Sequence, residues 1–131
     1  MKSLRDIERE KLNKVSEKII ECAYKIHNTL GCGFLEKVYE NSLIIELRKA
    51  GLNANQQEPI KVLYENTVVG NYLADILVAE EVIVELKAKK IIDDIDKAQL
   101  LNYLNATKLR LGIILNFGMP KLQIKRLVKG F

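Results

Sequence analysis

The first fifty residues repeat apolar positions at the spacing of an α-helix. Residues from about 6 to 30 predict a first helix, and Gly31 is a natural end for it. The apolar stripe of this helix is formed by Val15, Ile19, Cys22, Ala23 and Ile26. A second helix is predicted from about 35 to 50, closed by Gly51. We expect one stripe of this helix to consist of Leu35, Val38, Ser42 and Ile45.

After Pro59 the hydrophobic pattern becomes that of strands. Three runs rich in β-branched and apolar residues follow one another: 59–65, 67–78 and 81–88. Glu65-Asn66 and Ala79-Glu80 are turn candidates between them. The pattern therefore predicts a three-stranded antiparallel meander.

The last forty residues predict one more helix and two more strands. Residues 91–107 return to helical spacing, with Asp93 or Asp94 as the N-cap. Residues 109–117 are apolar on both faces, which is typical of a buried central strand, and 121–128 indicate an edge strand. Because strand–helix–strand crossovers are right-handed, 109–117 should run parallel to 81–88. We expect an α/β (α+β) fold, with a mixed β-sheet covered by helices.

Length and composition narrow the class of protein. The 131 residues suit one domain, with a helix over about 1–30 and a core over 33–131. Hydrophobic residues make up 48% and charged residues 29%, as in globular proteins. No apolar run is long enough to span a membrane and the N-terminus is too charged for a signal peptide, so we expect a cytoplasmic protein. Two cysteines do not make a disulfide framework or a thiolate zinc site.

The positive charge is concentrated in the last third of the chain. The net charge is +4, yet residues 97–131 contain seven Lys or Arg and no Asp or Glu. A region of one sign attracts a polyanion, most commonly nucleic acid. A solvated basic edge strand that blocks association explains the same pattern, and the sequence does not decide between the two.

Three charged residues interrupt the most apolar hairpin: Asp75, Glu85 and Lys87. Side chains alternate along a strand, so Glu85 and Lys87 share one face. Asp75 and Glu85 lie at similar distances from the turn, and antiparallel pairing would bring their carboxylates together, where like charges repel. Lys87 could offset one carboxylate, and the remaining negative charge suits a divalent metal. The simpler alternative has both acids facing solvent; we favour the site because both strands are apolar on both faces.

Two helices offer further polar candidates. Glu36 heads a second helical stripe with Tyr39, Leu43 and Leu47 and could point inward, although an acid at a helix N-terminus is common without any function. Gln99 and Tyr103 are four residues apart on the third helix and could reach the carboxylates or a phosphate. More often such residues form the solvated side of a helix. His27, the single histidine, is expected to cap the first helix.

These residues also resemble a known family. Asp75 followed by Glu85-Leu86-Lys87 resembles the D…(D/E)-X-K signature of the PD-(D/E)XK nuclease superfamily. Residues 33–39 match the G-x-x-E-x-x-Y motif of the GxxExxY proteins, a branch of that superfamily. The likeness extends from about Ile26 to Gly118, which is most of the chain.

The resemblance implies an αβββαβ restriction-endonuclease-like core and a metal-dependent nuclease that hydrolyses phosphodiester bonds. The expected cofactor is Mg²⁺, with Mn²⁺ as an alternative, and the implied metal ligands are Glu36, Asp75 and Glu85, with the Leu86 carbonyl as a further donor. Lys87 would orient water or stabilise charge on the phosphate, and Gln99 with Tyr103 would line the site.

The chain also departs from the pattern of such relatives. Asp96 stands where they often have a His, and Leu73 stands where they often have an Arg. We therefore keep a catalytically inactive nucleic-acid-binding or interaction module as the alternative, and a purely structural Glu85–Lys87 ion pair as a third. The expected partner is nucleic acid, DNA rather than RNA, with no membrane. A homodimer would suit a small nuclease that spans a duplex, although no residue indicates one.

Overall fold

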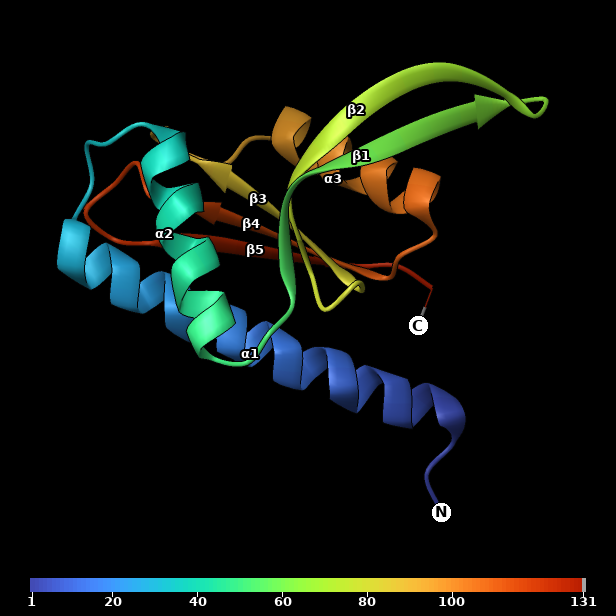
Figure 1. Ribbon diagram of the computed structural model, residues 1–131, viewed down its shortest axis with the longest axis horizontal. Helices are drawn as coiled ribbons and strands as arrows, with labels where there is room; N and C mark the ends of the chain where they lie inside the picture. Colours follow the sequence, from blue (N-terminus) through green and yellow to red (C-terminus); the bar gives the residue numbers. More distant parts are fainter. Residues whose placement is uncertain (131) are drawn as a thin grey trace.

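The computed structural model describes residues 1–130, which form a five-stranded mixed sheet with helices on both faces (Figure 1). The elements follow in the order α1 Leu4–Leu30, α2 Glu36–Lys49, β1 Ala54–Tyr64, β2 Thr67–Val78, β3 Val82–Lys87, α3 Asp94–Thr107, β4 Leu111–Asn116 and β5 Gln123–Val128. The strands lie in sequence order across the sheet. β3 and β4 are parallel and every other neighbouring pair is antiparallel. The predicted fold class and the parallel crossover are confirmed.

Local sequence signals fix the ends of the helices. α1 begins with a capping box between Ser3 and Asp6, and Gly31, with φ of 70°, is its C-cap. α3 begins with a second box in which Asp93 is the N-cap and Asp96 bonds back to it. The predicted C-terminal end of α1 at Gly31 and the predicted N-cap of α3 at Asp93 are therefore confirmed.

Both predicted turns are present, and β1 is longer than predicted. Glu65 and Asn66 have φ of 49° and 63°, and Ala79 and Glu80 have φ of 53° and 58°. Positive φ at both central residues gives the turn the twist that joins antiparallel strands. β1 begins at Ala54 rather than near Pro59, because the polar segment before the proline also pairs with β2.

The sheet separates two apolar layers. One contains α1, α2 and the side chains of Val84, Leu86, Ile113 and Leu115. The other contains α3 with Ile83, Ile114 and Ala74. All six residues of β4 are buried, as predicted for a central strand covered on both faces.

The buried stripe of α2 is not formed by Leu35, Val38, Ser42 and Ile45. Val38 and Ile45 are exposed, by 37% and 59%, and Leu35 precedes the helix. The buried stripe is the second one predicted, with Tyr39, Leu43 and Leu47. The two stripes are both plausible from spacing, and packing decides between them, because Tyr39 stacks on Phe117 with ring centroids 4.4 Å apart.

The hairpin of β1 and β2 extends past the other strands as an arm (Figure 1). Several large apolar side chains on it are exposed: Leu63, Tyr64, Val68, Val69, Tyr72 and Leu73. α3 packs against β1 and lies near the base of this arm. Within residues 1–130, no helix is long and apolar enough to span a membrane.

Candidate active site

At Asp75 and Glu85, side-chain hydrogen bonds take the place of the backbone pairing between β2 and β3. The register pairs Ile76 with Val84 and ends there, so Asp75 and Glu85 would be the next pair. The Asp75 N–H donates instead to Glu85 Oε2 at 2.8 Å. The Leu86 N–H donates to Asp75 Oδ2, also at 2.8 Å. The two carboxylates thus lie between diverging strands, as turn geometry predicted, and each is held by a backbone N–H of the opposite strand.

The ladder is also interrupted on the other side of Asp75. β1 and β2 pair through Gln56–Ile76 and Glu58–Ala74, but no pair joins Gln57 to Asp75. Gln57 has φ of 53°, which is unusual for a residue with a side chain. At Asp75, the backbone of β2 is therefore paired neither with β1 nor with β3. This leaves room beside the carboxylate.

Glu85 is a buried acid in an unfavourable electrostatic setting. Only 5% of its surface is exposed. Burial, followed by the charge of Asp75, raises the pKa of Glu85 to about 8. The charge of Lys87 opposes this shift, but it is the smallest of the causes. A bound cation would keep the Glu85 carboxylate ionised near neutral pH.

Lys87 is directed towards a different acid from the expected one. Its Nζ lies 3.7 Å from Asp96 Oδ1, at the start of α3. Lys89 Nζ also contacts Asp96, with a distance of 2.8 Å to Oδ2. Asp96, the departure noted in the sequence, is therefore a buried capping residue that attracts two lysines.

The segment 31–39 presents Glu36 beside this site. Gly33 has φ of 114°, a conformation that favours glycine. The Tyr39 hydroxyl donates to the Gly31 carbonyl at 2.6 Å and accepts from the Phe34 N–H at 3.3 Å. The loop is thus pinned by a tyrosine that is itself buried. The spacing of the G-x-x-E-x-x-Y motif has a physical reason: glycine for the turn, tyrosine for the anchor, and Glu36 as the exposed first residue of α2.

Glu36 and Asp75 line the same hollow, with a volume of about 610 Å³. Glu40, one helical turn after Glu36, lines it as well. Glu40 is only 3% exposed and accepts from Lys37, Gln56 and Gln57. Sequence reasoning missed Glu40, although its i, i+4 relation to Glu36 is a signal that could have found it.

The far wall of the hollow is built by the turn after β4. Asn116, fully buried, accepts from the N–H groups of Lys89 and Gly118 and donates to the Lys89 carbonyl. A Cβ on Gly118 would lie 2.2 Å from the Lys89 carbonyl oxygen, so only glycine fits. This turn fixes the segment that follows Lys87.

His27 does not cap its helix. Its Nε2–H donates to the Met119 carbonyl at 2.8 Å, and its ring lies 5.9 Å from that of Phe117. The cap of α1 is made by backbone alone, from the Gly31 N–H to the His27 carbonyl. The side chain ties α1 to the turn after β4, a tertiary contact that helix-end signals do not encode.

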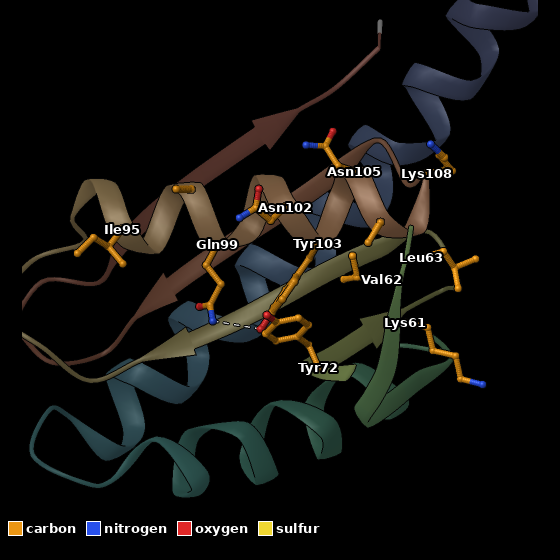
Figure 2. Close-up of a pocket in the computed structure, with 12 residues that line it drawn as sticks. Lys61, Val62, Leu63, Tyr72, Ile95, Gln99, Asn102, Tyr103, Asn105 and Lys108 are labelled. Carbon is orange, nitrogen blue, oxygen red and sulfur yellow. Dashed lines mark hydrogen bonds between the residues drawn. The ribbon is translucent and has the colours of Figure 1, made fainter. Parts of the chain in front are cut away.

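Gln99 and Tyr103 lie on the other side of the sheet from Glu36. Gln99 Nε2 donates to the Tyr103 hydroxyl at 3.1 Å. Both line a pocket of about 680 Å³ between α3 and the arm (Figure 2). Burial raises the pKa of Tyr103, and the charges of Glu85 and Asp75 raise it further. Tyr103 therefore lies within electrostatic reach of the carboxylate pair.

Three basic residues of the last third contact other side chains of the protein. Lys97 lies 3.9 Å from Asp94, and Arg110 lies 3.4 Å from Glu8. Arg126 donates to Asn13 on α1. Since β5 is an edge strand as predicted, its lysine at position 125 fits the solvated-edge interpretation.

The carboxylates of the site are suitable ligands for a hard cation, but their side chains are not arranged around a common point. Asp75, Glu85 and Glu36 offer the oxygen donors that Mg²⁺ prefers. Within residues 1–130, no three His, Cys, Asp or Glu side chains are already arranged to hold a metal ion. Glu36 is exposed and no hydrogen bond or ion pair in that range restrains it. The donor set fits a metal if the Glu36 side chain turns towards Asp75.

Comparison with known proteins agrees with this geometry. A model of the PD-(D/E)XK nuclease superfamily matches residues 13–127, which include both hairpin acids and Lys87. The chain belongs to this superfamily. The match does not extend to the finer assignment to the GxxExxY proteins, which stays a prediction from the sequence motifs.

One solved structure shows the same fold at low sequence identity. The chain is similar to the protein in the "Crystal structure of SSO0001", with a TM-score of 0.52 and 11% identity. The match covers 93% of this chain and 60% of that one, so the chain spans less than two thirds of that protein's length. No curated protein matches the chain.

Proposed function

We propose that the protein is a metal-dependent nuclease that hydrolyses phosphodiester bonds of nucleic acid, DNA rather than RNA, with Mg²⁺ or Mn²⁺ as cofactor. The observation that carries this proposal is the buried Glu85 carboxylate beside the half-buried Asp75, in a superfamily of nucleases. A buried acid that faces a second acid is costly for folding unless a cation compensates its charge. A divalent ion would remove that cost.

Asp75, Glu85 and Glu36 would hold the cation, together with the Leu86 carbonyl. Bound there, the ion would polarise the phosphate and lower the pKa of a water molecule. Lys87, which follows Glu85 on the same face of β3, would donate to the phosphate and offset the charge that develops on it. To do so it would leave Asp96, from which it is already 3.7 Å away. Gln99 and Tyr103 would border the substrate on the α3 side.

The test is calorimetric titration of Mg²⁺ and Mn²⁺ into the protein and into Asp75→Asn and Glu85→Gln variants. We expect each substitution to weaken metal binding at least about tenfold and to reduce cleavage of a mixed set of DNA and RNA oligonucleotides on the order of 100-fold. Glu17→Gln, an exposed acid on α1, is the matched control and should bind and cleave as the unmodified protein does. Metal binding that survives in both site variants would contradict the proposal.

A catalytically inactive nucleic-acid-binding module is the second candidate. The ion pairs of Asp96 with Lys87 and Lys89 favour it, because they occupy the cations that a phosphate would use. Oligonucleotide binding without any metal-dependent cleavage, in a protein whose carboxylates still bind Mg²⁺, would support this second function over the first.

A further inference from the structure

The pocket between the arm and α3 has a lining unlike that of an ordinary surface hollow (Figure 2). Its floor is apolar, with contributions from Val62 and Ala106. Its α3 side presents two amides, Gln99 and Asn102. Lys61 and Lys108 lie at one end of it in this view. Aromatic, amide and cationic groups thus surround one volume of about 680 Å³.

Tyr72 supplies an aromatic face that solvent can reach. Its side chain is 51% exposed, although it lies on the inner side of the arm with Ile60 as its cross-strand partner. The ring is held in place from two sides. It packs against the buried Tyr103, with centroids 5.8 Å apart, and it lies over Gly70, where a Cβ would be 3.2 Å from its Cε2. The ring is therefore an ordered platform with a free face.

The amides of α3 have hydrogen-bonding capacity that the protein does not use. The Asn102 side chain is exposed and makes no hydrogen bond within residues 1–130. Gln99 uses its Nε2 to hold the Tyr103 hydroxyl, which leaves its Oε1 as an acceptor. A purely apolar occupant would leave these groups unpaired, which costs binding free energy.

The pocket adjoins the carboxylate pair. Tyr72 precedes Asp75 by three residues on β2, about 10 Å along an extended strand. Tyr103, which lines the pocket, belongs to the same apolar layer as Ala74, the neighbour of Asp75, and Ile83, two residues before Glu85. A base in the pocket could therefore belong to a nucleotide directly linked to a phosphate that is bound at Asp75 and Glu85.

We propose that this pocket binds the base of an unpaired nucleotide that neighbours the scissile phosphate. The base stacks on Tyr72, its polar edge meets Asn102 and Gln99, and Lys61 and Lys108 attract the flanking phosphates. Bases inside a duplex have both faces covered by their neighbours and cannot stack on a side chain, so the nuclease would act on single strands, ends or frayed junctions. This inference rests on the proposed function and names its substrate class.

The experiment uses a short single-stranded oligonucleotide with one 2-aminopurine, a base whose fluorescence falls on stacking, in EDTA so that no metal-dependent cleavage occurs. We expect the protein to bind it, to quench it, and to prefer it to a duplex of the same sequence. Tyr72→Ala should weaken binding about tenfold and abolish the quenching. Tyr72→Phe should retain both, and Asn102→Ala should weaken binding by a smaller factor.

Tyr64→Ala is the matched control, because Tyr64 lies on the same arm and is 67% exposed but does not line the pocket. Equal binding and quenching by the Tyr72→Ala and Tyr64→Ala variants would overturn the proposal, as would an unmodified protein that binds no single strand. A concentration-dependent dimer that Tyr72→Ala dissociates, without an effect on the oligonucleotide, would also overturn it and assign the arm to a second copy of the chain. The metal titrations of the Asp75 and Glu85 variants contain no nucleic acid, so this inference and the proposed function can fail separately.

Discussion

Two buried glutamates, Glu40 and Glu85, show how differently the protein treats the same side chain. Both are nearly inaccessible, with 3% and 5% of their surfaces exposed. Glu40 faces donors: Lys37 and the amides of Gln56 and Gln57. Glu85 faces another acid, which together with burial raises its pKa to about 8. A buried carboxylate surrounded by donors stabilises the fold, and one beside a second carboxylate is poised to bind a cation.

The largest difference that we expect between Glu85 and Glu40 is in how the stability of the protein depends on pH. Between the ordinary pKa of 4.5 and about 8, the folded state keeps a proton on Glu85 that the unfolded state has lost. The free energy of unfolding in EDTA should therefore fall as pH rises through this window, by on the order of 5 kcal/mol. Glu85→Gln should remove most of this slope. Urea unfolding between pH 5 and 9 measures it, and parallel profiles for the two proteins would contradict the assignment.

Removal of the other glutamate should act on stability at every pH. In Glu40→Ala, Gln57 loses its bonds to Glu40 and the bend of β1, with φ of 53°, loses its support. We expect the free energy of unfolding to fall by about 1–3 kcal/mol. The control is Glu17→Ala on the exposed side of α1, for which about 0.5 kcal/mol or less is expected. Chemical denaturation of both variants at pH 7 distinguishes them, and equal stabilities would mean that Glu40 is not structural.

The smallest effect should come from the cation beside Glu40. Lys37 Nζ lies 2.9 Å from Glu40 Oε2, but the lysine side chain is 57% exposed. Because the lysine is mostly solvated and Gln56 and Gln57 still donate to the buried Glu40, Lys37→Gln should cost only about 0.3–0.5 kcal/mol. Thermal unfolding at low and high salt checks this. A loss as large as that of Glu40→Ala would show that the charge, rather than the amides of β1, satisfies Glu40.

The fold was predictable because its signals are local. Helix caps such as Asp93, turns such as Glu65-Asn66 and the apolar run at 111–115 are set by neighbours in sequence. The pairing of Asp75 with Glu85 was predictable for the same reason, since a turn fixes the register of the strands on either side of it.

The rest of the site depends on contacts between distant segments. No spacing rule indicates that Lys87 meets Asp96 or that Glu40 holds two glutamines of β1. Two apolar stripes were predicted on α2, and only the stacking of Tyr39 on Phe117 selects the stripe with Leu43 and Leu47 as the buried face.

By itself, the sequence determined the order of the elements, the mixed sheet and the two acids that face each other across a hairpin. These follow from hydrophobic periodicity and turn chemistry, which act over a few residues. Only the tertiary structure decided which acids are satisfied, where the lysines point and that an aromatic pocket lies beside the carboxylates. Those outcomes require α2, α3 and the arm to be packed on one sheet, and burial and electrostatic neighbours exist only after that packing.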